Sequence, residues 1–207
     1  MNEWVRLFRQ VAELTGGDSD LDRLYRALYE KSLSGSADCG GLTVFNYVSG
    51  EPVTGFNEGC PVIVRQSDAE LNLADFVRAH LYSAFASLAY GMRILTGEHV
   101  RIDRLMGHGG IFRHCGAGQR YLSAAVSAPV FTMKTAGEGG PYGMALLAAF
   151  CMDGKGRSLS DFLEEDVFSA AEVSMVLADQ DETAGFRTYL DRFLRLRPVE
   201  KAASELV

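Results

Sequence analysis

Residues 105–112 read LMGHGGIF, and residues 135–143 read TAGEGGPYG before the apolar run MALLAA at 144–149. Each glycine cluster follows a strand-like run and precedes a helix-like run. Glycine lets the backbone approach a ligand closely and adopt a positive φ. Two interpretations are open. The clusters make tight strand-to-helix turns, or their N–H groups cradle a phosphate or ribose beside a helix N-terminus.

Neither cluster satisfies the common nucleotide fingerprints. A GxGxxG motif that starts at Gly107 needs glycine at position 112, which is Phe112. One that starts at Gly137 needs glycine where Tyr142 stands. The pattern GxxxxGK followed by Ser or Thr is absent from the sequence, which excludes a P-loop.

From residue 73 onward, the sequence alternates between helix-like and strand-like segments. Apolar residues recur every three or four positions over 73–96, which predicts a long helix. Strands are predicted at 102–106 and 129–133, and helices at 119–127 and 141–152. This alternation indicates an α/β fold. Ligands in such folds bind beyond the carboxyl ends of the strands, which is where both glycine clusters lie.

The flanking segments complete the outline. Helices are predicted at 2–14 and, after an N-cap at Asp20, over the next apolar stretch, followed by strands at 42–48 and 61–65. Beyond Ser158 the pattern predicts two or three amphipathic helices, one of them over 186–196. It leaves open whether these helices pack on this domain or on another.

Composition limits the partners. The 207 residues carry a formal net charge of −7, which argues against a nucleic-acid-binding surface. The longest apolar run, 144–152, is too short to span a membrane, and the first residues lack the apolar core of a secretion signal. The scattered cysteines favour reduced thiols in the cytoplasm, with Cys151 packed inside. The four are Cys39, Cys60, Cys115 and Cys151.

Several motifs, taken in order, resemble the carboxyl-terminal domain of the FGGY carbohydrate kinases, the relatives of xylulokinase, ribulokinase and glycerol kinase. The GHGG turn at 107–110 and the EGGPYGMA segment at 138–145 are similar to the family's paired glycine motifs. Upstream, FNYVSGEP at 45–52 is similar to its Pro-Tyr-Leu-Ser-Gly-Glu-Arg segment. The helix at 73–96 matches the family's long helix, and the resemblance covers most of 42–152.

The resemblance implies a fold and a cofactor. Family members have two actin-like, ribonuclease-H-like domains with a cleft between them. They use ATP, with Mg²⁺ in the complete enzyme. By resemblance, Gly107, Gly109 and Gly110 line the adenosine and α-phosphate side of ATP or ADP. His108 stands where many relatives have glycine, and it contacts a ribose or phosphate or stabilises the turn.

Two other segments complete the implied nucleotide site. By resemblance, Ser49 and Gly50 lie near the phosphates, and Glu138 and Gly139 support the adenosine pocket. The turn departs from the family pattern because Gly110 is followed by the bulky sequence IFR at 111–113. These departures indicate a divergent branch of the family.

The resemblance also indicates what the sequence lacks. Family members take the catalytic Asp and the sugar pocket from an amino-terminal domain, and an Asp-x-Gly-Thr/Ser phosphate motif precedes the region that matches. That motif is absent here, and the chain is too short for two such domains. We therefore expect 1–157 to be a partial nucleotide-binding domain of an actin-like, ribonuclease-H-like ATPase fold with an incomplete sheet, and 158–207 to be a helical tail.

Two functions remain open at this point. The first is the ATP-binding domain of a kinase that phosphorylates a sugar hydroxyl, with a pentulose as substrate. The sugar would bind the missing amino-terminal domain, and the chain alone would be inactive. The second is a non-catalytic nucleotide-binding or regulatory partner module. An unpaired strand edge would promote homo-oligomers in either case.

Overall fold

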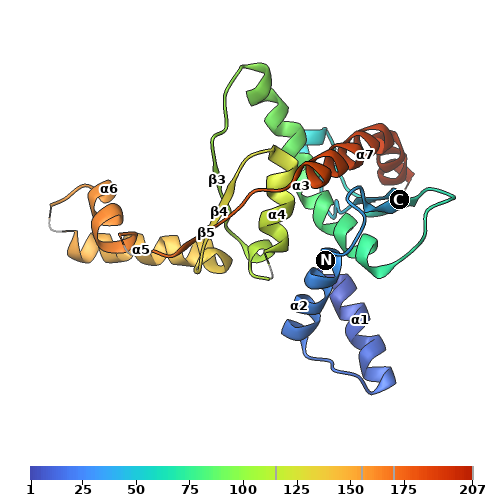
Figure 1. Cartoon of the computed structure of the whole chain (residues 1–207), viewed down its shortest axis with the longest axis horizontal. Helices are drawn as coiled ribbons and strands as arrows, with labels where there is room; N and C mark the ends of the chain where they lie inside the picture. The colour runs from blue at the N-terminus through green and yellow to red at the C-terminus, as the bar shows by residue number, and fades with distance from the viewer. Residues whose placement is uncertain (115, 155, 170, 207) are drawn as a thin grey trace.

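The computed structural model describes residues 1–114, 116–154, 156–169 and 171–206, so Cys115 lies outside the described residues. Figure 1 shows the arrangement of the elements. The helices are α1 (Asn2–Thr15), α2 (Leu21–Ser32), α3 (Leu73–Gly97), α4 (Ala117–Val126), α5 (Gly139–Asp153), α6 (Leu159–Phe162) and α7 (Gln180–Leu206). The strands are β1 (Leu42–Phe45), β2 (Val62–Arg65), β3 (Leu105–Met106), β4 (Val130–Met133) and β5 (Val173–Val176). Short helical segments are η1 (Cys39–Gly41), η2 (Pro52–Thr54), η3 (Gly110–Phe112), η4 (Ala136–Glu138) and η5 (Leu163–Val167).

The strands form two small sheets in the described part of the chain. β1 pairs antiparallel with β2, and Leu42 lies opposite Arg65. In the other sheet β4 is central, parallel to β3 on one side and antiparallel to β5 on the other. The predicted α/β class is confirmed. Both sheets are small: one has the strand order β1-β2 and the other has the order β3-β4-β5.

Helix α3 is the centre of the molecule. Its predicted apolar stripe buries Val77, Leu81 and Phe85 in a core shared with α2, α4, α7 and β1. The Asn72 side chain caps the helix by accepting the backbone N–H of Asp75, which satisfies one of the free donors of the first turn. The last turns of α3 project beyond the core at the top of Figure 1, so the end of the stripe is exposed.

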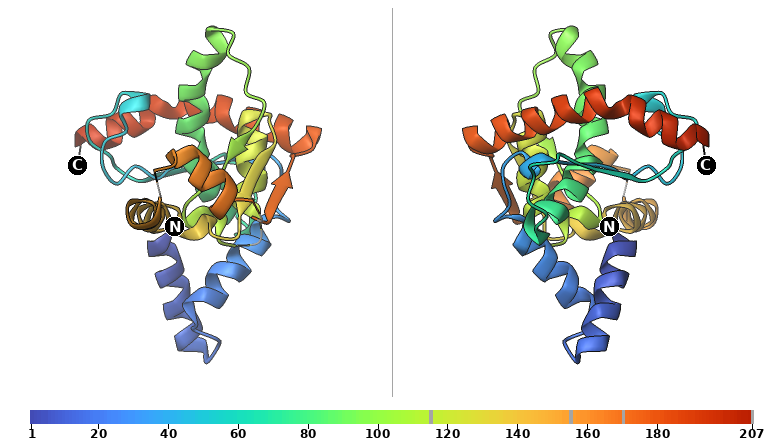
Figure 2. Two further views of the ribbon diagram at one scale, coloured as in Figure 1. Left: turned by 90° about the vertical axis from the view of Figure 1, so that its left-hand side faces the viewer. Right: turned by 90° about the vertical axis from the view of Figure 1, so that its right-hand side faces the viewer.

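The amino-terminal helices form a hairpin that projects from this core, as both views in Figure 2 show. Asp20 caps α2 as predicted, because its side chain accepts the backbone N–H of Arg23. Gly16 ends α1 in the left-handed conformation at φ 70°. The hairpin is attached through Trp4, whose ring meets that of Phe76 on α3 at a centroid distance of 4.8 Å.

Helix α7 packs on this core, which answers the question that the sequence left open. Phe186, Tyr189 and Phe193 are almost fully buried in the same core cluster as α3 and β1. The Tyr189 hydroxyl donates to the carbonyl oxygen of Ala79 at 3.1 Å. The helix continues through Pro198 to Leu206, beyond the expected end at 196, although proline removes one helical hydrogen bond. The expected division of the chain at residue 157 stays a prediction.

Three expectations about individual elements are wrong. The tail contains strand β5, which pairs with β4 over forty residues earlier in the chain, where only helices were expected. The strands expected at 42–48 and 102–106 shorten to β1 and β3, because the pairings with β2 and β4 cover only 42–45 and 105–106. Cys151 is exposed, since α5 contains no buried residue among those described.

His80 is a buried histidine rather than a ligand. It is 2% exposed and lies against Trp4 and Phe76, and its Nδ1–H donates to the carbonyl oxygen of Phe76 at 2.8 Å. Burial lowers the pKa of His80 to about 4; the nearby amino terminus adds to this effect, and the hydrogen bond to Phe76 opposes it. The folded protein therefore holds this imidazole neutral.

The pH dependence of stability follows from this shift. Between about pH 6.5 and 4 the unfolded chain binds a proton at His80 that the folded chain does not. The free energy of unfolding is thus at its full value above pH 6.5 and falls with pH by up to about 1.4 kcal/mol per unit. Urea unfolding from pH 7 to 5 should show this slope, and a flatter one in His80→Gln. Equal slopes would contradict the assignment.

A matched pair of substitutions tests the docking of α7. A Cβ atom at Gly185 would lie 2.4 Å from the backbone carbon of Ala37, whereas one at Gly143 on α5 meets nothing within 4 Å. We expect Gly185→Ala to cost about 1–3 kcal/mol through overpacking. Gly143→Ala should add up to about 1 kcal/mol through helix propensity. Urea unfolding measures both, and a neutral Gly185→Ala would place α7 elsewhere.

Candidate functional site

The two glycine clusters lie together in the structure. Gly107 donates its N–H to the carbonyl oxygen of Phe131 at 2.8 Å, in the ladder between β3 and β4. Gly109 donates to the carbonyl oxygen of Ala136 at 2.7 Å, which ties the first loop to the second. Because β3 and β4 are parallel neighbours, both loops leave the sheet at the same edge.

The individual glycines have different roles. A Cβ at Gly107 would lie 2.6 Å from the Phe112 ring, and one at Gly139 would lie 2.9 Å from the Cβ of His108. Close packing therefore leaves no room for a side chain at these two positions. Gly109 has φ 111°, which disfavours any side chain, and no atom lies within 4 Å of a Cβ built there or at Gly110. Gly109 and Gly110 therefore present open backbone to solvent.

A hollow of about 690 Å³ lies beside the second loop. Its lining includes Arg113, Lys134, Gly137, Glu138 and Ser174. Arg113 forms an ion pair with Glu138, and Lys134 forms one with Glu172. These cations can shift between their carboxylate partners and an anionic ligand, because both pairs are exposed and such pairs are weak.

Helix α5 begins at this edge. Its N-cap is Glu138, and the side chain of Glu138 does not bond to the first-turn N–H groups. Those donors, together with the partial positive charge of a helix N-terminus, favour an anion. The sequence did not single out Lys134, which directly follows β4 at its carboxyl end. The sequence could have identified Lys134 as a candidate site residue, because it follows a predicted strand and precedes a glycine loop.

Ser49 and Gly50 lie on another loop. This loop joins β1 to β2 and lies beside the carboxyl-terminal part of α7, as the cyan segment in Figure 2 shows. The loop folds back so that Gly50 packs against the backbone of Asn57: a Cβ at Gly50 would lie 2.3 Å from the carbonyl oxygen of Asn57. It also contacts α7, where Arg197 donates to the carbonyl oxygen of Thr54. The structure thus brings Glu138 and Gly139 to the 107–110 loop, but not Ser49 and Gly50.

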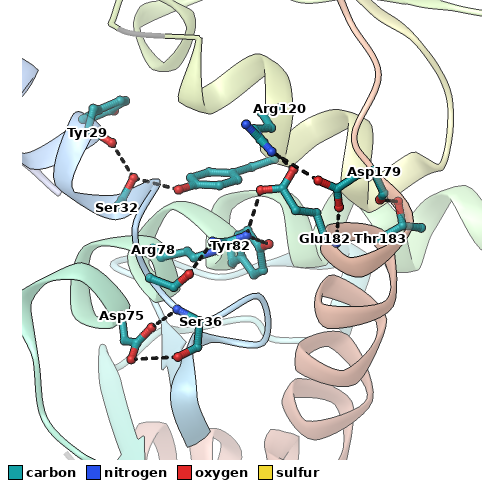
Figure 3. Close-up of polar contacts among 12 residues, drawn as sticks. Tyr29, Ser32, Ser36, Asp75, Arg78, Tyr82, Arg120, Asp179, Glu182 and Thr183 are labelled. Carbon is teal, nitrogen blue, oxygen red and sulfur yellow. Dashed lines mark hydrogen bonds and ion pairs between the residues drawn. The ribbon is translucent and has the colours of Figure 1, made fainter.

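A second polar cluster lies inside the molecule, where α3, α4 and α7 meet (Figure 3). Arg78 donates to the carbonyl oxygen of Gly35 at 2.8 Å, to the hydroxyl of Tyr82 at 2.9 Å and to Glu182 at 3.2 Å. Its guanidinium also lies 5.0 Å from the ring centroid of Tyr121. Arg120 approaches the other oxygen of Glu182 from the surface.

This cluster is structural. Arg78 is 2% exposed, so a ligand does not reach its guanidinium. Burial raises the pKa of Tyr121 to about 12, so that its phenol stays neutral, and it shares a hydrogen bond with Ser32 at 2.8 Å. The hydrogen bond to Glu182 raises the pKa of Arg120 above its usual value. Arg78, Arg120 and Glu182 hold one another in fixed positions, so this cluster supports the packing of the helices and not a reaction.

The described residues do not fit a metal site. They contain no group of three His, Cys, Asp or Glu side chains placed to hold an ion. In addition, no described helix combines the length and apolarity required to cross a bilayer.

Comparison with known protein families identifies the chain. The family model for the carboxyl-terminal domain of the FGGY family of carbohydrate kinases matches residues 1–152. The chain belongs to this family. The match includes both glycine loops, the long helix α3 and the β1–β2 hairpin, in the order that the sequence resemblance proposed.

Solved structures of FGGY kinases share the fold. Gluconate kinase from Lactobacillus acidophilus has a TM-score of 0.66 and 14% identity, over 91% of this chain and 36% of its own. Xylulose kinase from the same organism has a TM-score of 0.65 and 16% identity, over 86% of this chain and 35% of its own. Xylulose kinase from Rhodospirillum rubrum has a TM-score of 0.64 and 14% identity, over 97% and 39%.

These matches define the fold as an α/β domain with small sheets, of the actin-like ATPase type found in the carboxyl-terminal half of FGGY kinases. The chain spans little more than a third of the length of these enzymes. A search of curated protein sequences returned no match.

The buried ion pair has a testable energetic signature. Glu182→Leu leaves Arg78 charged without its carboxylate, and we expect a loss of about 3–5 kcal/mol of unfolding free energy. Glu13→Leu breaks the exposed pair with Arg9 and should cost less than about 1 kcal/mol. Urea unfolding at pH 7 compares the two variants. Equal losses would show that burial of the Arg78 pair has no special role.

Proposed function

We propose that this FGGY domain binds ATP or ADP at the two glycine loops, as the nucleotide-binding part of a kinase that phosphorylates a pentulose. One observation carries this proposal: the Gly109 N–H to Ala136 bond joins the loops at the end of parallel strands, beside the start of α5. The backbone of Gly109 and Gly110 is open there, so that a nucleotide can approach within van der Waals contact.

Charge supports the same location. Arg113 and Lys134 border the adjacent hollow, and the first turn of α5 adds uncapped N–H donors. A nucleotide needs only this local complementarity, so the net charge of −7 on the chain as a whole does not oppose it. His108 lies beside Gly139 at the junction of the loops, which supports a contact between this histidine and the ribose or a phosphate.

The groups needed for phosphoryl transfer divide between two domains. Phosphoryl transfer needs a base for the sugar hydroxyl, a metal ion and a clamp on the phosphates. The glycine loops supply part of the clamp. Among the described residues no group of three His, Cys, Asp or Glu side chains is placed to hold a metal ion, and Glu138 and Glu172, which line the hollow, are paired with Arg113 and Lys134. We therefore infer that a kinase amino-terminal domain provides the base and the sugar pocket, and that this chain alone does not transfer phosphate.

The pentulose assignment rests on relatives. Two of the similar solved structures are xylulose kinases, and xylulose is a pentulose. Gluconate kinase shares the fold equally well, and we therefore infer that the other domain selects the sugar. A kinase reconstituted with that domain should turn over xylulose or ribulose faster than gluconate, as measured by coupled ADP release.

Nucleotide binding tests the site directly. We expect the chain to bind ADP or ATP weakly, in the millimolar range, because it holds only part of the phosphate clamp. Gly110→Leu places a side chain into the open approach and should weaken binding at least about tenfold, or about 1.4 kcal/mol. Isothermal titration calorimetry measures both values.

Gly97→Leu is the matched control. A Cβ at Gly97 would also meet open space, but this glycine lies at the end of α3, so its substitution should leave nucleotide affinity unchanged. If wild-type chain binds neither ADP nor ATP at several millimolar while remaining folded, the proposed nucleotide site is wrong. Equal weakening in both variants would place the nucleotide elsewhere.

A further inference from the structure

A cavity of about 420 Å³ lies between α3, α4 and α7, where α7 passes beside the other two helices (Figure 1). Its lining includes Ile102, which precedes β3, and Ser127, which precedes β4. The cavity therefore lies at the amino ends of these two strands, whereas the glycine loops lie at their carboxyl ends. Its volume falls within the range of cavities that bind small molecules.

The wall of this cavity is mainly apolar. Phe186 and Leu190 on α7 line it and are almost fully buried in the core of the molecule. Met92 on α3 and Val126 at the end of α4 are half-buried and add to the wall. A wall of this kind offers a sugar or polyol few partners for its hydroxyl groups, and burying unpaired hydroxyls is unfavourable. The cavity therefore selects a ligand with an apolar body.

Three charged side chains line the same cavity. Arg93 on α3 pairs with Asp191 on α7 at 3.7 Å, and both side chains are more than half exposed, so the pair is weak. Arg187, one turn before Asp191, has no side-chain partner among the described residues. Two positive charges and one negative charge leave the cavity with one net positive charge.

The helix ends beside the cavity do not change this balance. The last carbonyl oxygens of α4, which ends at Val126, carry partial negative charge, and the first turn of α7, which contains Thr183, carries partial positive charge. These two contributions oppose each other. One net positive charge matches a carboxylate, which carries a single negative charge, better than a phosphate monoester, which carries close to two. A guanidinium also fits a carboxylate, because it can donate two parallel N–H bonds.

We propose that this cavity is a binding site for a small monocarboxylate with an apolar body. Its carboxylate pairs with Arg187 and Arg93 at the surface, and its body packs on Phe186 and Leu190. The inference is independent of the proposed function, because it uses no residue of the glycine loops. Such a ligand contacts α3, α4 and α7 at once, so that its binding stabilises the folded chain by mass action.

Three probes test the chemistry of the site by isothermal titration calorimetry on the full chain at pH 7. We expect octanoate to bind in the millimolar range or tighter and to raise the melting temperature. Octan-1-ol keeps the apolar body without the charge, and gluconate keeps the charge without the apolar body, so each should bind at least about tenfold more weakly. Absence of octanoate binding to the folded chain at several millimolar overturns the proposal, as does equal affinity for all three probes.

Two variants test the location of the site. Arg187→Gln removes the unpaired positive charge, and Ala125→Leu adds a larger side chain to the part of the wall that α4 provides. Each should weaken octanoate binding at least about tenfold, or about 1.4 kcal/mol. Far-UV circular dichroism verifies that each variant is folded.

Matched controls should retain the wild-type affinity for octanoate. Arg6→Gln makes the same charge change at an exposed position on α1, and Ala202→Leu adds the same side chain at an exposed position on α7, and neither residue lines the cavity. If both test variants bind octanoate as tightly as the wild-type chain, octanoate occupies another apolar surface and the proposal is wrong. Equal weakening in test and control variants leads to the same conclusion.

Discussion

The hydrogen bonds of the buried Arg78 guanidinium are the interactions on which the rest of the fold depends. The guanidinium joins the loop after α2, through the carbonyl oxygen of Gly35, to Tyr82 on its own helix and to Glu182 at the start of α7. A charge inside a protein is tolerated only with partners of this kind. Because Arg120 on α4 shares the same carboxylate, one ionic group sets the positions of α3, α4 and α7 together.

This frame reaches the candidate site through α4. The Gln119 amide donates to the carbonyl oxygens of Val130 on β4 and Ser174 on β5, at 2.7 and 3.1 Å. Strand β4, which leads into the second glycine loop, and its neighbour β5 are therefore held by side-chain as well as ladder bonds. A rigid sheet edge presents the open backbone of Gly109 and Gly110 in a fixed orientation, which is the arrangement that a weakly charged nucleotide site requires.

Local patterns predicted the parts of this structure that depend on local physics. The spacing of Val77, Leu81 and Phe85 identified α3, and the alternation of helices with strands placed both glycine loops at one sheet edge. Strand β5 was missed because its partner β4 is distant in sequence. The amphipathic pattern over 186–196 identified only the middle of α7, which continues through Pro198 although proline usually ends a helix. The different roles of Gly107 and Gly110 depend on where the Phe112 ring packs, which no local pattern specifies. The placement of Ser49 and Gly50 near phosphates stays a prediction.

The position of α7 in the chain has a consequence for synthesis. Its side chains bond to residues made long before it: Tyr189 reaches Val44 across 145 positions, and Arg192 reaches Asp38 across 154. Such long-range contacts slow folding. While the ribosome is still translating, β1 and α3 face solvent with the binding surface for α7 uncovered, and Arg78 waits for its carboxylate. Cooperative folding of this core therefore waits until α7 has been synthesised, and until then its apolar surface stays exposed.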